Sequence, residues 1–489
     1  MRPALAFLNG VLIERIISEA IDVLCKLGVE LHNENVLSLL SDFGAQVDKS
    51  QQRVLFKPDL IEKSLRTAAR PFKLFNVLGN ETHFFVDNNV YFTPGSAAIH
   101  LLDYDSKEMR RPNTQDYMTY AKIVSQLDNI ASQSTAFIPA DVPDGISDSY
   151  RLFLSLLYCE KPVVTGTFTV DSFAVMRDFQ VAVRGSVQSL KEKPLTIFSA
   201  CPTSPLKWSD VTSQNVVDCA LHGIPVEFIA MPLSGFMAPV SKVGTLVQHT
   251  AETLSGIVIS QLASPGAPVL YGGSPAIFDL RYETTPMGAI ETMMLDCGYN
   301  EIGKHLDIPT QAYISLSDAK LLDAQAGLES GIGAALAVLS GINNIAGPGM
   351  LNFENCQSLE KLVLDNEICG MTLQLAKGIE PKEDIPAMAL FQELLAEGHL
   401  LIADHTRRYV HEEILFPGPV IDRANASRWR DEGAKTLVER AHAAVSDLVE
   451  RYQPSRLADD VKNELIELME REARRYGQDH LPKRQEDSV

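Results

Sequence analysis

Acidic and aromatic side chains recur beside glycine- and proline-rich segments in the second half of this chain. An apolar, β-branched run ends in Ala346-Gly347-Pro348-Gly349, and Phe353 and Glu354 follow in a polar loop. Asp318 ends a second such segment, after Ser315, Leu316 and Ser317. A carboxylate that faces a cavity complements a cation, and an aromatic face holds a quaternary ammonium at roughly 0.5–2 kcal/mol per contact. These residues predict a pocket for a cationic small molecule, with Glu354 and Asp318 as candidate catalytic groups.

Further candidates lie at or near the ends of predicted strands. Core packing is the competing role for each aromatic residue, and turn formation is the competing role for each glycine. Glu227 lies within a predicted strand and could point inward or outward, whereas Asp323 could simply cap a helix. The aromatic candidates are Phe137, Phe168, Tyr271, Tyr313 and Phe353, and the candidates for close approach of a ligand to the backbone are Gly272, Gly273, Gly347 and Gly349.

Motifs for other chemistries are missing from the sequence. It contains no HExxH, GxSxG, Walker or CxxC motif, and the six-residue spacing of His405 and His411 is poor for two ligands on one helix face. A zinc-bound thiolate at Cys201 stays open, with a small buried cysteine as the competing interpretation. The sequence therefore predicts no metal site.

Strands alternate with helices through the middle of the chain, which is typical of parallel βα units. An open doubly wound sheet is the alternative, but Ile138-Pro139-Ala140-Asp141 is not a dinucleotide-binding turn. We therefore expect an α/β fold of the TIM (β/α)8 type, with its site where the strands end. Seven strands are clear, and Leu400–Asp404 could supply the eighth. The strand candidates are Ile130–Ile138, Val163–Phe168, Leu195–Ala200, Val226–Met231, Val269–Gly272, Thr310–Ser315 and Ile342–Ala346, and helices are expected near Ser147–Cys159, Asp171–Gly185, Ser209–His222, Lys242–Leu262, Met287–His305, Leu322–Leu339 and Leu359–Lys377.

Three segments differ in their pattern. Residues 1–112 predict a small helical and β-hairpin cap, with short strands that include Val90–Phe92. Residues 113–424 form the predicted barrel, and residues 425–489 form a helical extension that packs on the barrel or on a second subunit. The extension favours a homo-oligomer.

Composition limits the class of protein. The 489 residues carry a formal net charge of -20, which argues against a nucleic-acid partner. No run of 18 apolar residues and no signal-peptide pattern is present, so we expect neither a membrane span nor secretion. Seven scattered cysteines favour free thiols in a reducing compartment, and the cytoplasm is the expected location.

Several segments in order resemble the trimethylamine methyltransferase family over nearly the whole chain. They include Ser317-Asp318-Ala319-Lys320, the stretch Asp323–Glu329, Gly347–Leu351 and Leu359–Glu367, with His405, Thr406 and Arg407 further on. The resemblance implies a TIM barrel and transfer of a methyl group from an amine to Co(I) of a separate corrinoid protein.

One departure from the family affects the substrate. Founding members carry pyrrolysine, which is thought to present a tertiary amine as a cationic adduct, and this chain contains only the standard residues. A quaternary amine is already cationic and leaves as a neutral amine, so direct displacement needs only positioning and a dry pocket. The resemblance thus implies a betaine-like quaternary amine, such as glycine betaine, as the methyl donor.

The resemblance also implies roles for the candidates. The aromatic residues would surround the onium group, Glu354 would add attraction, and glycine backbone amides, His405 or Arg407 would hold a carboxylate. No cofactor is expected to bind tightly, because a corrinoid-binding protein supplies the cobalamin and docks on the loops after the strands. Two alternatives stay open: a barrel that binds quaternary amines without turnover, as a sensor or carrier, and an enzyme that passes the methyl group to a folate-type acceptor.

Overall fold

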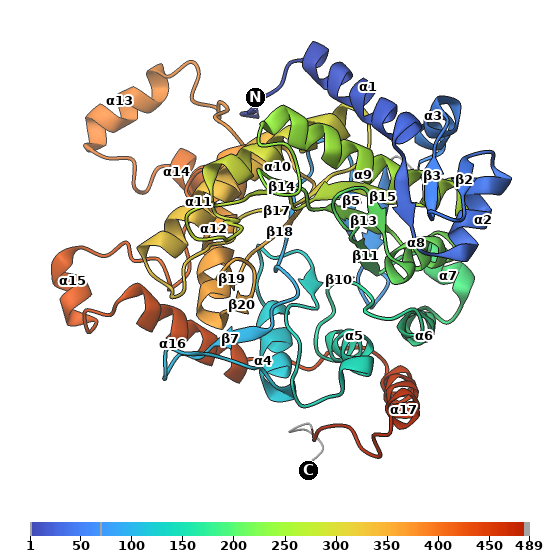
Figure 1. Ribbon diagram of the computed structural model, residues 1–489. Helices are drawn as coiled ribbons and strands as arrows, with labels where there is room; N and C mark the ends of the chain where they lie inside the picture. The colour runs from blue at the N-terminus through green and yellow to red at the C-terminus, as the bar shows by residue number, and fades with distance from the viewer. Residues whose placement is uncertain (1, 69–70, 484–489) are drawn as a thin grey trace.

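Parallel strands occupy the centre of the molecule, with helices outside them (Figure 1). The computed structural model describes residues 2–68 and 71–483. A five-stranded parallel sheet has the order β15-β13-β11-β10-β9, and a three-stranded parallel sheet has the order β17-β18-β6. The bounds are β6 Tyr91–Thr93, β9 Gln133–Ser134, β10 Val163–Thr165, β11 Thr196–Ala200, β13 Val226–Ala230, β15 Val269–Gly273, β17 Gln311–Tyr313 and β18 Asn344–Ala346.

The two sheets meet at both edges, but their hydrogen-bonded ladder is not continuous. A single bridge between Tyr271 and Thr310 joins β15 to the segment before β17. At the other seam, the Ala131 amide donates to the Phe92 carbonyl at 2.8 Å. The strands therefore follow the order of a (β/α) barrel without closed pairing in the part of the chain that the structure describes.

The eighth strand is not the one suggested by the sequence. Leu400–Asp404 forms a turn that leads into helix α14, Asp404–Glu413, so that expectation is wrong. Strand β6, within the predicted cap segment, takes the place beside β18, with Phe92 paired to Ile345. The short apolar run Val90–Phe92 carried the signal for this strand, although its place in the parallel order could not be read from it.

The outer helices begin and end where local residue types dictate. Side chains of Ser209, Ser241, Asp323 and Ser358 accept hydrogen bonds from the first turns of α8, α9, α11 and α12. Asp323 is therefore a helix cap, and Gly341, with φ of 74°, ends α11 in the left-handed region. The helices are α4 Thr114–Val124, α5 Ser147–Tyr158, α6 Ser172–Arg184, α7 Val187–Glu192, α8 Asp210–His222, α9 Lys242–Ala263, α10 Ile290–His305, α11 Ala324–Ser340 and α12 Leu359–Ala376.

A hairpin fills the amino-terminal end of the strands. Strands β4, Phe72–Phe75, and β5, Glu81–Phe85, pair in antiparallel fashion. Their apolar side chains form a separate buried cluster with inward-facing residues of three barrel strands. The cluster contains Phe72, Leu74, Phe85, Val164, Ile197 and Leu270. This hairpin closes the amino-terminal end of the strand arrangement, and we call it the floor.

The rest of the amino-terminal region packs outside the strands. Helix α1, Gly10–Lys26, and helix α3, Pro58–Thr67, contact α9. A four-stranded sheet, β12-β1-β3-β2, joins this region to the barrel loops through β12. The remaining elements here are β1 Val29–Leu31, α2 Glu34–Asp42, β2 Gln46–Asp48, β3 Arg53–Leu55 and β12 Lys207–Trp208.

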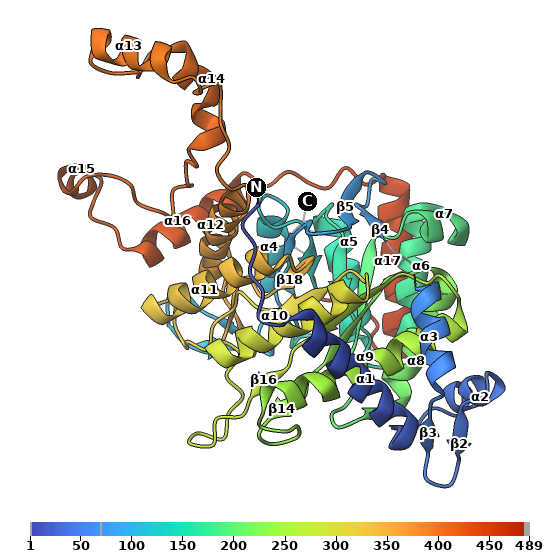
Figure 2. The ribbon, with the colours of Figure 1, turned by 90° about the horizontal axis from the view of Figure 1, so that it is seen from above.

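The carboxyl-terminal region has two different parts. Helix α16, Leu437–Glu450, packs on α12 and α4, and helix α17, Asp459–Arg475, packs on α6 and α5. Helices α13, Met388–Glu397, and α14 extend away from the body, and α15, Ala426–Asp431, lies on another projecting loop (Figure 2). No helix within the described ranges is long and apolar enough to cross a membrane.

Further short strands lie in the loops at the carboxyl ends of the central strands. β14, Leu233–Ser234, pairs with β16, Ala276–Ile277. The remaining four form the sheet β19-β20-β7-β8. Their bounds are β7 His100–Leu102, β8 Met109–Arg110, β19 Met350–Leu351 and β20 Cys356–Gln357.

Candidate active site

Glu227 on β13 points into the interior of the strand arrangement and is completely buried. Ser199 Oγ on β11 donates to its Oε1 at 2.7 Å, and Asn344 Nδ2 on β18 donates to its Oε2 at 3.0 Å. Asn344 in turn accepts from Thr93 Oγ1 on β6 at 3.0 Å. Because β13 and β18 belong to different sheets, this chain of hydrogen bonds crosses the interior. Burial raises the pKa of the Glu227 carboxyl to about 7.

Glu354 approaches the same region on the hairpin between β19 and β20. Asn352, Phe353 and Glu354 all lie in the left-handed region, with φ of 51°, 57° and 68°. Side chains other than glycine adopt this conformation at a cost, and such positions concentrate at functional sites. Glu354 Oε1 is shielded from solvent and has no hydrogen-bond partner among the described residues. Burial raises the pKa of this carboxyl well above its usual range.

A buried ion pair holds the base of that hairpin. Lys361 Nζ on α12 lies 2.5 Å from Asp365 Oδ2 and donates to Ser330 Oγ at 2.7 Å. The same Asp365 oxygen accepts from the Gly349 amide at 2.6 Å. Gly349 has φ of 87°, and a Cβ there would lie 2.2 Å from Gln357 Oε1, so only glycine fits this turn.

Asp296 on α10 is a third buried acid. Neither of its carboxyl oxygens has a hydrogen-bond partner in the described parts of the chain. The neighbouring Tyr299 hydroxyl instead donates to the carbonyls of Gly273 and Gln311, at 2.9 and 3.0 Å, where β15 and β17 separate. Burial raises the pKa of Asp296 well above its usual range, and the charge of Glu354 raises it further. The two acids are therefore close enough to interact.

Tyr313, at the end of β17, lies close enough to Glu227 and Glu354 to be affected by their charges. Its hydroxyl lies 3.5 Å from Ser96 Oγ. Burial raises its pKa, and the charges of Glu354 and Glu227 raise it further. Cys201, just after β11, also has a pKa raised to about 12 by burial and then by Glu227 and Glu354. We call Glu227, Asp296, Tyr313 and Glu354 the mouth cluster.

Gln311 adds an amide beside the cluster. It is completely buried on β17, and its Oε1 accepts from the Gly273 amide at 3.1 Å. Its Nε2 has no partner in the described structure. A Cβ on Gly272 would lie 2.5 Å from Gln311 Oε1, so this predicted glycine makes room for the amide. The cluster therefore combines three acids with raised pKa values and unpaired polar atoms, which is an environment suited to a cationic ligand.

Two predicted aromatic residues face the helices instead of the interior, which corrects the expectation that they line the cavity. Tyr271 donates its hydroxyl to Thr250 Oγ1 of α9 at 2.8 Å. Phe137 packs edge-on against Tyr117 and Tyr120 of α4. Side chains alternate between the faces of a strand, so one position decides whether a residue faces the cavity.

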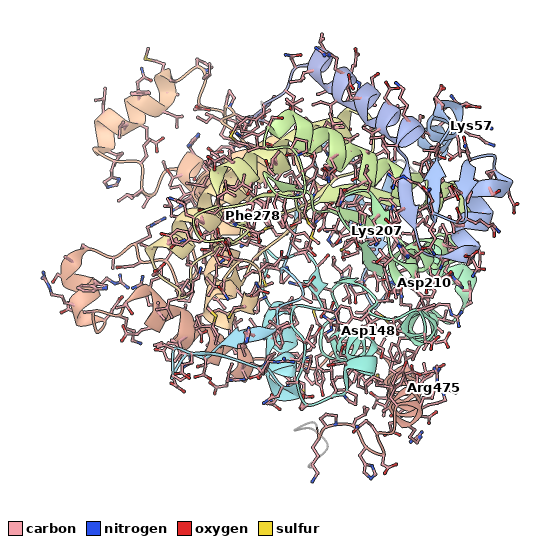
Figure 3. The ribbon with its side chains drawn as sticks, viewed as in Figure 1. Lys57, Asp148, Lys207, Asp210, Phe278 and Arg475 are labelled. Atoms are coloured by element: carbon pink, nitrogen blue, oxygen red, sulfur yellow. The ribbon has the colours of Figure 1, made fainter. Side chains whose placement is uncertain are left out.

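Two other aromatic residues already hold cations of the chain. The Lys320 ammonium lies 3.8 Å from the centre of the Phe353 ring. The Arg151 guanidinium lies 4.6 Å from the centre of the Phe168 ring. Asp148 of α5, labelled in Figure 3, accepts from the Phe168 amide at 2.7 Å and fixes that loop. Of the five aromatic candidates, Tyr313 is the one that lies with the buried acids.

Asp318 connects two loops. Its two oxygens accept from the amides of Met287 and Gly288, both at 2.9 Å. Burial raises its pKa to about 6. Asp318 thus fastens the segment before α10 to the loop after β17, which is a positioning role.

The remaining candidates lie elsewhere. His405 and Arg407 belong to α14, where His405 Nε2 contacts the Lys382 carbonyl at 2.9 Å, so the structure does not bring them to the mouth cluster. Gly273 lies against His249, and Gly347 lies against the Ile314 carbonyl, where a Cβ would clash. Within the described ranges, no three histidine, cysteine or acidic side chains are grouped closely enough to hold a metal ion.

Sequence reasoning missed Asp296, Gln311 and the partners of Glu227. Asp296 and Tyr299 are three positions apart on α10 and share its inner face. An acidic residue on the buried face of a predicted helix was therefore the sequence feature that could have indicated Asp296. Gln311 and Tyr313 are two positions apart on one strand, so their common direction also followed from the sequence once Tyr313 was placed.

Apolar side chains surround the mouth. Phe236 stacks on Phe278, which is labelled in Figure 3, with ring centres 4.8 Å apart beside β14 and β16. Other large apolar residues of these loops are exposed to solvent. They are Met231, Met237, Val240, Leu280 and Tyr282. We call Phe236 and these five residues the mouth rim.

Parallel strands with polar groups at their carboxyl ends are typical of an α/β enzyme. The family model described as trimethylamine methyltransferase (MTTB) matches residues 2–477, so the chain belongs to this family of amine:corrinoid methyltransferases. The trimethylamine methyltransferase of Desulfitobacterium hafniense is 27% identical over 460 residues, covering 94% of this chain and 92% of that protein. The trimethylamine methyltransferase of Methanosarcina barkeri is 29% identical over 460 residues, covering 92% of each.

A relative with a different named substrate is similar to the same extent. The glycine betaine methyltransferase of D. hafniense is 26% identical over 469 residues, covering 96% of this chain and 97% of that protein. Among solved structures, the monomethylamine methyltransferase of M. barkeri has a similar fold, with a TM-score of 0.50 and 10% identity over 95% of this chain and 89% of that chain.

Proposed function

We propose that this protein transfers a methyl group from a quaternary amine to reduced cobalt of a corrinoid carried by a separate protein. The observation that supports this most is the mouth cluster, in which both carboxyl oxygens of buried Asp296 and Oε1 of half-buried Glu354 are shielded from solvent and have no hydrogen-bond partner among the described residues. An ionised carboxylate away from water is costly unless hydrogen bonds or a positive charge compensate it, and these three oxygens have no hydrogen-bond partner in the described structure. A cationic substrate would supply that charge.

The acids are suited to a cation that arrives from water. Without a ligand, burial raises the pKa of each acid, which favours the neutral form and so reduces the cost of several buried charges. A bound onium group favours ionisation of at least one of them, because the attraction is strong where water is excluded. Tyr313 would then contribute an aromatic wall to the site.

The reaction requires no general acid when the donor is quaternary. The methyl carbon accepts an electron pair from Co(I), and the carbon–nitrogen bond breaks with its electron pair remaining on nitrogen. The products are a neutral tertiary amine and a methylated Co(III) corrinoid, so no proton is transferred. What this chain contributes is a dry site and the alignment of the methyl group with the open mouth.

The acceptor would reach the site from the mouth. The rim residues Phe236, Leu280 and Tyr282 are exposed apolar side chains on loops that follow β13 and β15. Exposed apolar groups of this kind favour docking of another protein. The seven free cysteines support the cytoplasm as the location.

The test is to incubate the protein with a Co(I) corrinoid protein and a panel of quaternary and tertiary methylated amines. We expect the spectrum of the methylated corrinoid with a quaternary donor, and much less of it with the Glu227→Gln variant. The matched control is Glu252→Gln, because Glu252 is equally buried but accepts from Ser204, Leu206 and Gln248, none of which belongs to the mouth cluster. Binding of the amines without methyl transfer would favour a sensor or carrier, and transfer to a tetrahydrofolate would favour a folate-type acceptor.

A further inference from the structure

Helices α13 and α14 form a projecting arm, residues 379–416, whose helices contain no buried residue. Both figures show this arm extending away from the body (Figures 1 and 2). Ten-residue helices are marginal in water unless an apolar face packs against a partner. The arm carries large exposed apolar side chains, including Leu395, which is 82% exposed. They are Ile379, Ile385, Met388, Phe391, Leu395, Leu401, Ile402, Ile414, Leu415 and Phe416.

The outer face of α11 is a second uncovered apolar surface. Leu328 and Ile332 lie one turn apart and are 62% and 41% exposed. A Cβ on Gly327 or Gly331 would meet no other atom within 4 Å, so another chain can approach this face closely. The only charged residue of α11 is Glu329, which accepts from Ser317 Oγ at 2.6 Å and so points towards the barrel loops. A helix that is apolar on its outer face is normally covered.

The position of these surfaces indicates what covers them. In Figure 2 the arm extends from one end of the molecule, and β14 and β16 mark the mouth at the other end. A protein that delivers the acceptor to the mouth therefore does not reach the arm. In Figure 1 the arm and α11 lie on the same side of the molecule, so a two-fold axis beside them brings each arm to the α11 of a second copy.

We propose that the arm of one chain docks on the outer face of α11 of a second copy of this chain. Each copy then covers both apolar surfaces of the other, and the contact closes as a two-fold dimer. The mouths stay open to substrate and acceptor. The choice of a second copy over the acceptor protein rests on the proposed function, which places the acceptor at the mouth, whereas the exposed apolar surfaces themselves do not depend on it.

The experiment measures mass in solution by light scattering on the purified full chain. We expect a particle of about twice 53.8 kDa. Leu395→Glu in the arm and Ile332→Glu in α11 should each reduce it to the mass of one chain at the same concentration. The matched control is Val11→Glu on α1, because Val11 is also highly exposed but lies on another side of the body. A single cooperative thermal transition and a circular dichroism spectrum that keeps most of the wild-type helix signal should show that all three variants fold, while loss of the contact lowers the thermal midpoint only of the arm and α11 variants.

A mixing experiment identifies the contact itself. A Leu395→Glu chain keeps an intact α11 face, and an Ile332→Glu chain keeps an intact arm. A mixture of the two should therefore recover two-chain particles with one intact contact. A wild-type protein with the mass of one chain overturns the proposal, as does an assembly that survives both substitutions or a mixture that recovers nothing.

Discussion

Glu227 should couple binding of a cation to loss of a proton. Its pKa of about 7 in the folded protein means that it is largely protonated below that pH, whereas an onium group is bound best by the ionised form. Affinity for a quaternary amine should therefore rise as pH increases through about 7, by at most about tenfold per pH unit for one proton released. Calorimetry in two buffers of different ionisation enthalpy measures that proton release directly.

The variant Glu227→Gln separates this effect from other groups. Its affinity should be lower and should depend less on pH near 7, while Glu252→Gln should behave as the wild type in binding. Equal affinity of the wild type at about pH 6 and about pH 8 would contradict the role assigned to Glu227.

The same carboxyl group should reduce stability at high pH. Its pKa is near 4.5 in the unfolded chain and about 7 in the folded protein, so the folded state holds the proton more tightly. This contribution is fully present below about pH 4.5 and is lost as pH rises through about 7, at a cost of up to roughly 3 kcal/mol. Glu227→Gln should therefore become more stable relative to wild type between about pH 5 and about pH 8 in urea unfolding. A difference between the two proteins that is the same at both pH values would refute this.

At the scale of single residues, the sequence predicted some members of the mouth cluster, which remains a candidate site. Glu354 and Tyr313 lie in the mouth cluster as candidates chosen from the ends of strands, and Asp318 lies close by in a positioning role. Tyr271 had the same sequence features as Tyr313, but it faces α9 because the strand β15 presents its other face there. The direction of a side chain on a three- to five-residue strand depends on register, and glycine-rich strands lack the alternating pattern that would reveal it.

At the scale of elements, the buried pair Lys361–Asp365 ties helix α12 to the hairpin that carries Glu354. Lys361→Met and Asp365→Asn each leave an unpaired charge without solvent, so each should lower the free energy of unfolding by roughly 3–5 kcal/mol. The double variant removes both charges, and its asparagine retains an acceptor for the Gly349 amide, so it should lose less than the sum of the two. Urea unfolding of all four proteins gives the coupling energy. Strict additivity would show that the pair does not act as a unit.

Most of the expected strands and helices are present, and the errors concern Ile130–Ile138 and the eighth strand. All helices from α5 to α12 except α7, which was not predicted, lie within a few residues of the expected ranges. The strand expected over Ile130–Ile138 is reduced to Gln133–Ser134, because the seam with β6 departs from regular pairing. The error at Leu400–Asp404 arose because a short apolar run in an extended arm resembles a buried strand until its neighbours are known.

At the scale of the whole molecule, the mouth rim should decide how well the acceptor protein binds. Leu280→Glu or Tyr282→Glu places a charge on an exposed apolar surface, and each should raise KM for the corrinoid protein by about tenfold or more, with little change in amine affinity. Steady-state kinetics at saturating amine measures this, with Val11→Glu as the control on a distant exposed surface. An unchanged KM for both variants would place acceptor docking elsewhere.

The floor formed by the β4–β5 hairpin has a consequence for the order of events. Phe72, Leu74 and Phe85 pack against Val164, Ile197 and Leu270 at the end opposite the mouth, so the interior of the strand arrangement is closed at that end. Under the proposed function, the amine would bind before the corrinoid protein covers the mouth, and the demethylated amine would leave only after that protein dissociates. Kinetics should follow a compulsory sequence, and demethylated amine should act as a competitive inhibitor against fresh donor.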